Sequence, residues 1–190
     1  MSVDSLQGGF ADAPRDAARA FRACLDVMAR PGTIAEVSGA VPPAPLSVGA
    51  GVILLTLCDP ETPIYLAGSH DSPEIRQWIS FHAGAPIAER RSDAVFAFGS
   101  WDDLMPLADY PIGSAEYPDR STTLVVEQAE LKADGARLSG PGIKDHPSLS
   151  LPETAAFQAN RHLFPQGLDF FFAAGARIAA LPRSTKVESI

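Results

Sequence analysis

Apolar residues recur at intervals of three and four along the first part of the chain, from Pro14 to Met28. This spacing predicts an amphipathic helix with one apolar stripe. Pro14 suits the first helical turn, and Pro31-Gly32 ends the element. The apolar stripe is formed by Ala17, Ala18, Phe21, Cys24, Leu25 and Met28.

Four further helices follow from the same kind of pattern. Residues from Ser47 to Leu57 are apolar nearly all round, which predicts a buried helix too short to cross a bilayer. The next helix is expected over Pro73 to His82, opened by a capping box of Asp71 and Glu74. A short helix is expected over Trp101 to Ala108, and a longer one over Pro152 to Leu163.

Short apolar or alternating runs bounded by turn residues predict the strands. Two hairpins are expected, one around Ala133-Asp134-Gly135 and one around Ala174-Gly175-Ala176. Hairpins mixed with helices favour one α/β domain over residues 1–190, built on a mixed sheet flanked by helices. The expected strands are Thr33–Val37, Ile64–Ala67, Ala94–Phe98, Thr122–Glu127, Ala136–Leu138, Leu168–Ala173 and Arg177–Leu181.

Charge and composition narrow the possible partners. The 190 residues carry a formal net charge of −8, which disfavours nucleic acid as the main partner. The first ten residues show no secretory signal, so we expect a cytoplasmic protein without a membrane anchor. Cys24 and Cys58 lie in apolar segments and are interpreted as buried, reduced thiols.

Signatures of self-contained catalysis are missing from the sequence. There is no phosphate-binding G-x-x-x-x-G-K-[ST] loop, no G-x-G-x-x-G fingerprint and no G-x-S-x-G elbow. The four histidines have no metal-site spacing, so no metal is expected. Of three lysines, only Lys144 lies in a loop suited to a Schiff base, and a solvated charge is the favoured interpretation.

Arginines are the more promising basic residues. Arg15, Arg19 and Arg22 form a stripe along the first predicted helix, interpreted as a solvated flank paired with Asp16 and Asp26 rather than a phosphate site. Arg30 is held against a Pro-Gly turn and is therefore a better candidate for binding a ligand or partner.

Two arginines lie at strand ends. In the turn before the strand from Thr122, Asp119, Arg120 and Ser121 either orient a ligand or satisfy the turn's own backbone. Arg183 follows the last predicted strand, where a ligand site competes with a slightly favoured exposed tail.

The segment Leu138–His146 looks like a phosphate-binding loop, because two glycines precede a lysine. Pro141 removes a backbone N–H that such a loop needs. We therefore interpret it as a rigid exit from a strand, with Ser139 available to a ligand or partner and glycines that allow close backbone approach.

Seven segments in this order resemble the PhnH family, a subunit of the bacterial carbon–phosphorus lyase system that degrades phosphonates. The resemblance covers about residues 8–187. The segments are FRACLDVMARPG (Phe21–Gly32), LLTLCDPETPIYL (Leu54–Leu66), FHAGAP (Phe81–Pro86), YPDRSTTLVV (Tyr117–Val126), LSGPGI (Leu138–Ile143), FPQGLDFFF (Phe164–Phe172) and ALPRST (Ala180–Thr185).

The resemblance implies a core subunit required for making α-D-ribose 1-methylphosphonate 5-triphosphate from MgATP and a phosphonate, with release of adenine. It implies a homodimer that assembles with PhnG, PhnI and PhnJ and acts with PhnL. The implied fold is similar to the large domain of pyridoxal-phosphate-dependent transferases without the cofactor's lysine, so no bound cofactor is expected. No catalytic residue is assigned, and catalysis by this chain alone is not expected.

Two alternatives stay open at this point. The chain is either a stand-alone transferase on a degenerate pyridoxal-phosphate-type fold, or a purely structural dimeric scaffold. Whether Arg30, Arg120 and Arg183 converge in one pocket decides how credible a ligand site is.

Overall fold

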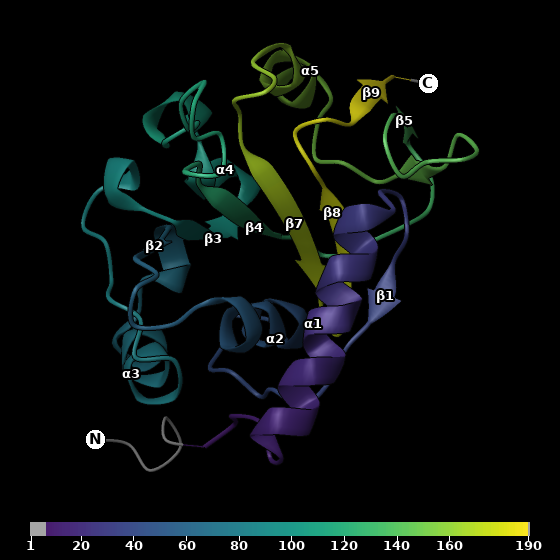
Figure 1. The fold of residues 1–190 in the computed structure, drawn as a ribbon. Coiled ribbons are helices and arrows are strands. Elements are labelled where there is room, and N and C mark those ends of the chain that lie inside the picture. The colour runs from purple at the N-terminus through teal and green to yellow at the C-terminus, as the bar shows by residue number, and fades with distance from the viewer. Residues whose placement is uncertain (1–6, 190) are drawn as a thin grey trace.

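A mixed sheet of six strands organises the protein in the computed structural model, which describes residues 7–189 (Figure 1). The strand order is β1-β8-β7-β4-β3-β2. Strands β2, β3, β4 and β7 run parallel, whereas β8 and β1 are antiparallel to their neighbours. The strands are β1 (Ala35–Glu36), β2 (Ile64–Leu66), β3 (Phe96–Ser100), β4 (Thr123–Glu127), β7 (Asp169–Ala174) and β8 (Arg177–Leu181).

Both faces of the central strands are buried, and alternate residues serve two different cores. In β4, Val125 faces one hydrophobic cluster while Leu124 and Val126 face the other. The first cluster packs under α1 (Ala13–Ala29), α2 (Val48–Leu57) and α3 (Pro73–His82). The second packs against α4 (Trp101–Leu104), α5 (Ala155–His162) and a small second sheet.

The small sheet consists of β6 (Ser148–Leu149), β5 (Ala136–Ser139) and β9 (Lys186–Glu188), all antiparallel. It corrects one sequence prediction, because β5 does not pair with β4. Leu138 and Leu149 are fully buried on the second core, so β5 contributes there as part of a separate layer. The mixed sheet and the closing hairpin of β7 and β8 are confirmed.

Helix boundaries agree with the sequence patterns, except that α5 begins at Ala155 rather than Pro152, one cap differs and one helix is divided. Ser72, not Asp71, caps α3 by accepting a hydrogen bond from the backbone N–H of Ile75 at 3.2 Å. Asp71 instead forms an ion pair with Arg76. The helix expected over 101–108 divides into α4 and the 3₁₀ turn Leu107–Asp109.

Three short 3₁₀ segments, Gly68–His70, Arg91–Asp93 and Leu107–Asp109, connect the larger elements. Within residues 7–189, no helix is both long and apolar enough to span a bilayer. Cys24 and Cys58 are free and buried, as expected, and burial raises the pKa of the Cys24 thiol to about 12. The expectation about a secretory signal concerns residues that partly lie outside the described range.

Candidate functional site

Arg183 lies at the edge of the main sheet where the parallel strands begin. It follows β8 and contacts Asp169, the first residue of β7. The backbone N–H and the Nε of Arg183 donate to Asp169 Oδ1 at 2.8 and 3.1 Å, and Nη2 donates to Oδ2 at 2.5 Å. We call this group, with Pro118 and Ser121, the arginine clamp.

The arginine clamp also fixes the turn before β4. Arg183 Nη1 donates to the carbonyl of Pro118 at 2.5 Å, and Nη2 donates to Ser121 Oγ at 2.5 Å. Only 13% of the Arg183 side chain is exposed, so these bonds form largely away from water. Three separate segments are therefore joined by one guanidinium. The expected exposed tail at 182–185 is wrong, because Thr185 is also buried.

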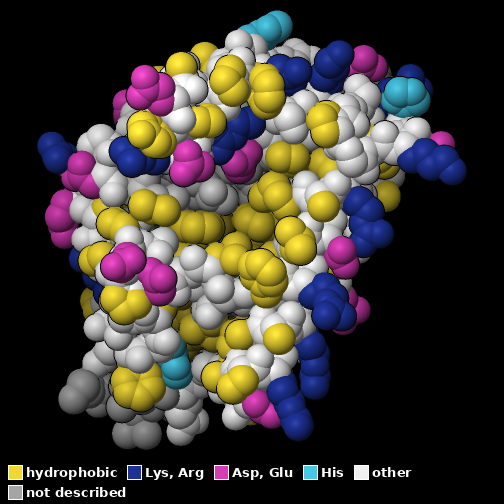
Figure 2. Space-filling view, viewed as in Figure 1, with side chains coloured by type: hydrophobic (Ala, Val, Ile, Leu, Met, Phe, Trp, Pro, Cys, Tyr) yellow, Lys and Arg dark blue, Asp and Glu magenta, His cyan; other side chains and the backbone are white. Residues whose placement is uncertain are grey.

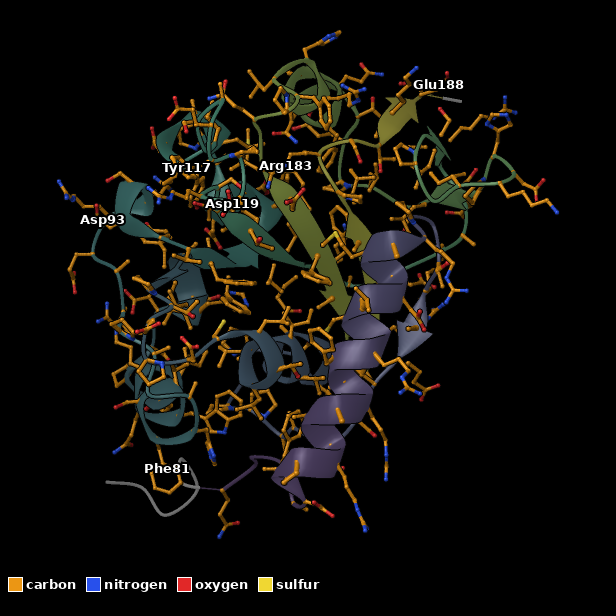
Figure 3. The ribbon with its side chains drawn as sticks, in the orientation of Figure 1. Phe81, Asp93, Tyr117, Asp119, Arg183 and Glu188 are labelled. Atoms are coloured by element: carbon orange, nitrogen blue, oxygen red, sulfur yellow. The ribbon has the colours of Figure 1, made fainter. Side chains whose placement is uncertain are left out.

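Asp119 and Arg120, in the same turn, are both exposed. The Arg120 guanidinium lies 4.2 Å from the centre of the Tyr117 ring, a cation–π contact. Figure 3 shows Tyr117, Asp119 and Arg183 near the start of β7. The structure thus brings four sequence candidates together, of which Arg183 and Ser121 are occupied by each other, while Asp119 and Arg120 are accessible.

The other two candidates lie elsewhere. Ser139 ends β5, where it pairs with Lys186 of β9. Arg30 follows α1 and forms an ion pair with Asp26 at 2.8 Å, with 61% of its side chain exposed. Among the described residues, the three candidate arginines have different partners: Arg30 pairs with Asp26, Arg183 pairs with Asp169, and Arg120 contacts the Tyr117 ring.

The loop after Ser139 connects these regions through backbone contacts. A Cβ on Gly142, which has a φ of +77°, would lie 1.9 Å from the carbonyl oxygen of Ala29 at the end of α1. One on Gly140 would lie 3.2 Å from the carbonyl oxygen of Ser184. The loop therefore requires glycine because two backbones approach it, as the sequence predicted. Lys144 in the same loop is exposed.

The opposite edge of the sheet, where the parallel strands end, holds polar residues that the sequence analysis missed. Glu127 ends β4, and its Oε1 accepts a hydrogen bond from the backbone N–H of Ser47 at 2.7 Å. Burial raises the pKa of Glu127 to about 7, although the bond to Ser47 works in the other direction. No described cation is paired with this carboxylate.

His70 and Asp103 lie at the same edge, after β2 and β3. His70 is 4% exposed, and neither ring nitrogen has a hydrogen-bond partner among the described residues. Burial lowers the pKa of His70, while the charge of Asp103 opposes the shift. Ser100 donates to Asp103 Oδ2 at 2.7 Å. Sequence spacing gives no sign of this group, because His70 and Asp103 are 33 positions apart and Asp103 and Glu127 are 24 positions apart.

Side chains that bind metals do not gather in the described part of the chain. No cluster of three or more His, Cys, Asp or Glu side chains occurs there that could hold an ion. The polar groups where the parallel strands begin are paired with one another, whereas His70, where the strands end, has no described hydrogen-bond partner. This arrangement defines a mixed α/β protein with buried polar side chains at both ends of its parallel strands.

The chain belongs to the PhnH family. A family model described as bacterial phosphonate metabolism protein (PhnH) matches residues 8–188, nearly the whole chain and the same span as the resemblance seen in the sequence. A curated relative from Rhizobium meliloti (strain 1021) is 40% identical over 189 residues. The alignment covers 95% of this chain and 94% of that relative, which is named alpha-D-ribose 1-methylphosphonate 5-triphosphate synthase subunit PhnH.

Proposed function

We propose that this chain is a core subunit of the carbon–phosphorus lyase complex. In this role it is required to form α-D-ribose 1-methylphosphonate 5-triphosphate from MgATP and a phosphonate with release of adenine. The observation that carries the proposal is the 40% identity, over almost the full length of both chains, to a relative named as a subunit of that synthase. Because the match covers nearly all of both chains, the similarity is not confined to one shared domain.

A subunit without its own catalytic centre fits the side chains described above. The arginine clamp is occupied by Asp169, Ser121 and Pro118. The acidic chain, with net charge −8, is a poor lone binder of MgATP and a phosphonate. We propose that the complex binds both substrates and that this chain carries no pyridoxal phosphate, its fold being related to the large domain of enzymes that use that cofactor.

Partner binding is the second part of the proposal. Phe21 and Leu25, one helical turn apart on α1, are 52% and 56% exposed. Figure 2 shows hydrophobic side chains gathered over the middle of this face, around α1 and α2. Large exposed apolar groups of this kind mark protein interfaces. We propose that this face contacts another subunit, either a second copy or PhnG, PhnI or PhnJ, in a cytoplasmic complex that works with PhnL.

Reconstitution tests the assignment directly. The complex should release adenine from MgATP and methylphosphonate only when this chain is included, and the chain alone should release none. Equal adenine release by a complex that lacks this chain would refute the proposal. Release by the isolated chain at the rate of the full complex would instead favour the stand-alone transferase.

Interface variants separate a docking role from a folding role. Leu25→Asp should abolish co-purification with the partner subunits while leaving the melting temperature of the isolated chain nearly unchanged. Phe81→Asp on α3 is the matched control, because Phe81 is 59% exposed and lies on a different helix (Figure 3). Equal loss of assembly in both variants would contradict an interface centred on α1.

A further inference from the structure

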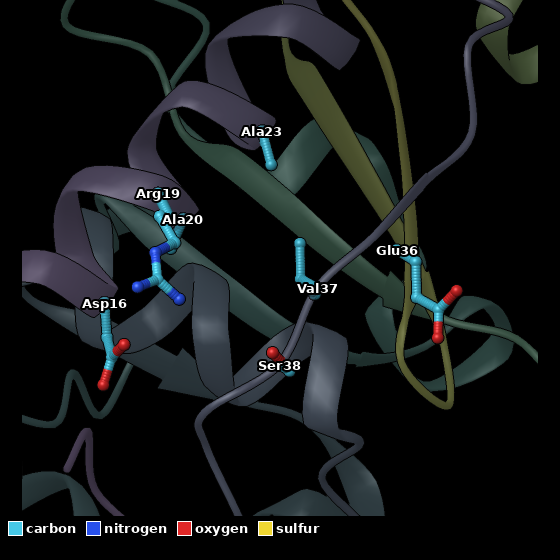
Figure 4. Close-up of a pocket in the computed structure, with 7 residues that line it drawn as sticks. All are labelled: Asp16, Arg19, Ala20, Ala23, Glu36, Val37 and Ser38. Carbon is cyan, nitrogen blue, oxygen red and sulfur yellow. The ribbon is translucent and has the colours of Figure 1, made fainter. Parts of the chain in front are cut away.

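A groove runs between α1 and the segment 33–38 that contains β1. Its narrower part, of about 140 Å³, is drawn in Figure 4, where Arg19 extends from α1 toward the segment carrying Ser38. The wider part has a volume of about 410 Å³. Arg19 and Ala23 line both parts, which together we call the α1 groove.

Three arginines line the wider part of the α1 groove. At about 100° per residue, Arg19 and Arg30 are separated by three helical turns plus about 20°, so they share a face of α1. Arg22 lies about 60° to one side of Arg19. Figure 2 shows Lys and Arg side chains along the right-hand border of the molecule.

The arginines of the wider part have few ion-pair partners within the protein. No ion pair is found for Arg19 or Arg22 in the described part of the chain, and Arg30 forms only its exposed pair with Asp26. Arg183 is fully engaged, by comparison. With Asp26 included, the wider part of the groove has a formal charge of +2 in a chain whose net charge is −8. The narrower part adds the carboxylates of Asp16 and Glu36, so the positive charge is confined to the wider part.

The remaining wall is small and apolar, formed by Ala18, Ala23 and Ala35 with Thr33. The rise of a helix places Arg19 and Arg30 about 16 Å apart along the axis. The negative end of the α1 dipole lies near Arg30, but its half charge is smaller than the excess of two positive charges. The groove therefore matches an elongated anion with charged groups at both ends and a compact, uncharged middle.

We propose that the wider part of the α1 groove binds a pentose phosphate ester or phosphonate with anionic groups on both sides of the sugar, held by Arg19 and Arg22 at one end and by Arg30 at the other. This inference rests on the proposed function, because the product of that reaction carries a phosphonate at C1 and a triphosphate at C5 of one ribose. The groove lies beside the exposed apolar face of α1, so a partner docked there would cover the bound sugar.

Calorimetric titration of the full chain at low ionic strength tests the inference, with ribose 1,5-bisphosphate and ribose 5-phosphate as probes. The bisphosphate should bind about tenfold or more tightly than the monophosphate, because a charge-assisted contact at a second end adds that much. Arg30→Ala should remove this difference. Arg22→Ala should weaken binding of the bisphosphate about tenfold, and Arg22→Lys should restore part of it.

Arg90→Ala is the matched control, since Arg90 is 75% exposed, carries the same charge and lies outside the groove. Absence of saturable binding to the unmodified chain would overturn the inference. An equal loss of affinity in Arg90→Ala and Arg22→Ala would also overturn it, because net charge alone would then explain the binding. Unchanged melting temperatures exclude misfolding as the cause.

The groove and the proposed function fail in different experiments. If the complex requires this chain for adenine release but the chain binds neither sugar, the groove inference is wrong and the subunit assignment stands. If the chain binds the bisphosphate through Arg22 and Arg30 but the complex releases adenine without the chain, the assignment is wrong and the binding site stands.

Discussion

Buried polar and charged side chains are paired at one edge of the main sheet and left largely unpaired at the other. Where the parallel strands begin, Asp169 has Arg183 as an ion-pair partner, and the guanidinium has further acceptors. Where they end, Glu127 has only the N–H of Ser47, and His70 has no described hydrogen-bond partner. A satisfied charge network holds a structure together, whereas isolated buried polar groups leave protonation and ligand binding open to change. The residues of the first edge lie in three of the segments that resemble the family, namely YPDRSTTLVV, FPQGLDFFF and ALPRST.

Removing Arg183 gives the largest expected effect. Arg183→Ala leaves Asp169 without its cation and releases Ser121 and Pro118, so the free energy of unfolding should fall by about 3 kcal/mol. Denaturant unfolding measures this change. Arg90→Ala breaks an equally bidentate but exposed pair with Asp93 and should lower the free energy of unfolding far less, because solvent screens the pair. Similar losses in both variants would show that the arginine clamp has no special role.

At the other edge, Gly68→Ala should cost about 2 kcal/mol. Gly68 has a φ of +56°, and a Cβ there would lie 2.2 Å from Asp103 Oδ2, so the carboxylate must move. Gly175→Ala is the control, because its φ of +57° is the same but no atom lies within 4 Å of the added carbon. The difference between the two unfolding free energies isolates the displacement of Asp103, and no difference would contradict it.

The buried carboxylate of Glu127 should make stability depend on pH. Its pKa is about 7 in the folded protein against an ordinary value of 4.5, so ionisation opposes folding. This cost is absent below pH 4.5 and grows until the pH passes about 7. Glu127→Gln should therefore gain about 1.5 kcal/mol relative to the unmodified protein between pH 4.5 and 8. Unfolding curves at both pH values measure the gain, and parallel pH profiles would contradict it.

The smallest effect is expected for Arg120→Ala, at about 0.5 kcal/mol. Arg120 is exposed and loses only its contact with the Tyr117 ring. Thermal unfolding should show almost no shift, while assembly with the partner subunits should weaken if this turn lies in an interface. A destabilisation as large as that of Arg183→Ala would mean that the exposed and buried arginines of this edge act as one network.

The sequence predicted the repeated, local features well. Three- and four-residue periodicity located α1, α2 and α3, and two consecutive apolar runs predicted the hairpin of β7 and β8. The sequence prediction was wrong for β5. The turn before this strand implied that β5 pairs with β4, whereas β5 pairs with β6 and β9. Local patterns set the propensity of a strand, but distant partners determine which sheet it joins.

The candidate residues show the same limit. The sequence analysis named Arg183 as a candidate for binding a ligand. Its hydrogen-bond partners Asp169 and Ser121 lie 14 and 62 positions away, so the sequence did not show that its donors are already used within the protein. Glu127 and His70 belong to no motif and become notable only through burial. The stripe of Arg19 and Arg22 was found from periodicity, but the wall formed by Ala35 required the fold.

The small sheet imposes an order on the folding of the chain while it is being synthesised. Strand β5 cannot complete its pairing until β9 exists, and β9 is formed by residues 186–188. The arginine clamp also waits for residue 183. A ribosome-bound chain can therefore assemble α1, α2 and the first parallel strands early, but its surface near the Gly140–Gly142 loop closes only once residues 183–188 have emerged. Truncation at residue 182 should leave that closure undone, even though every strand of the main sheet is then present.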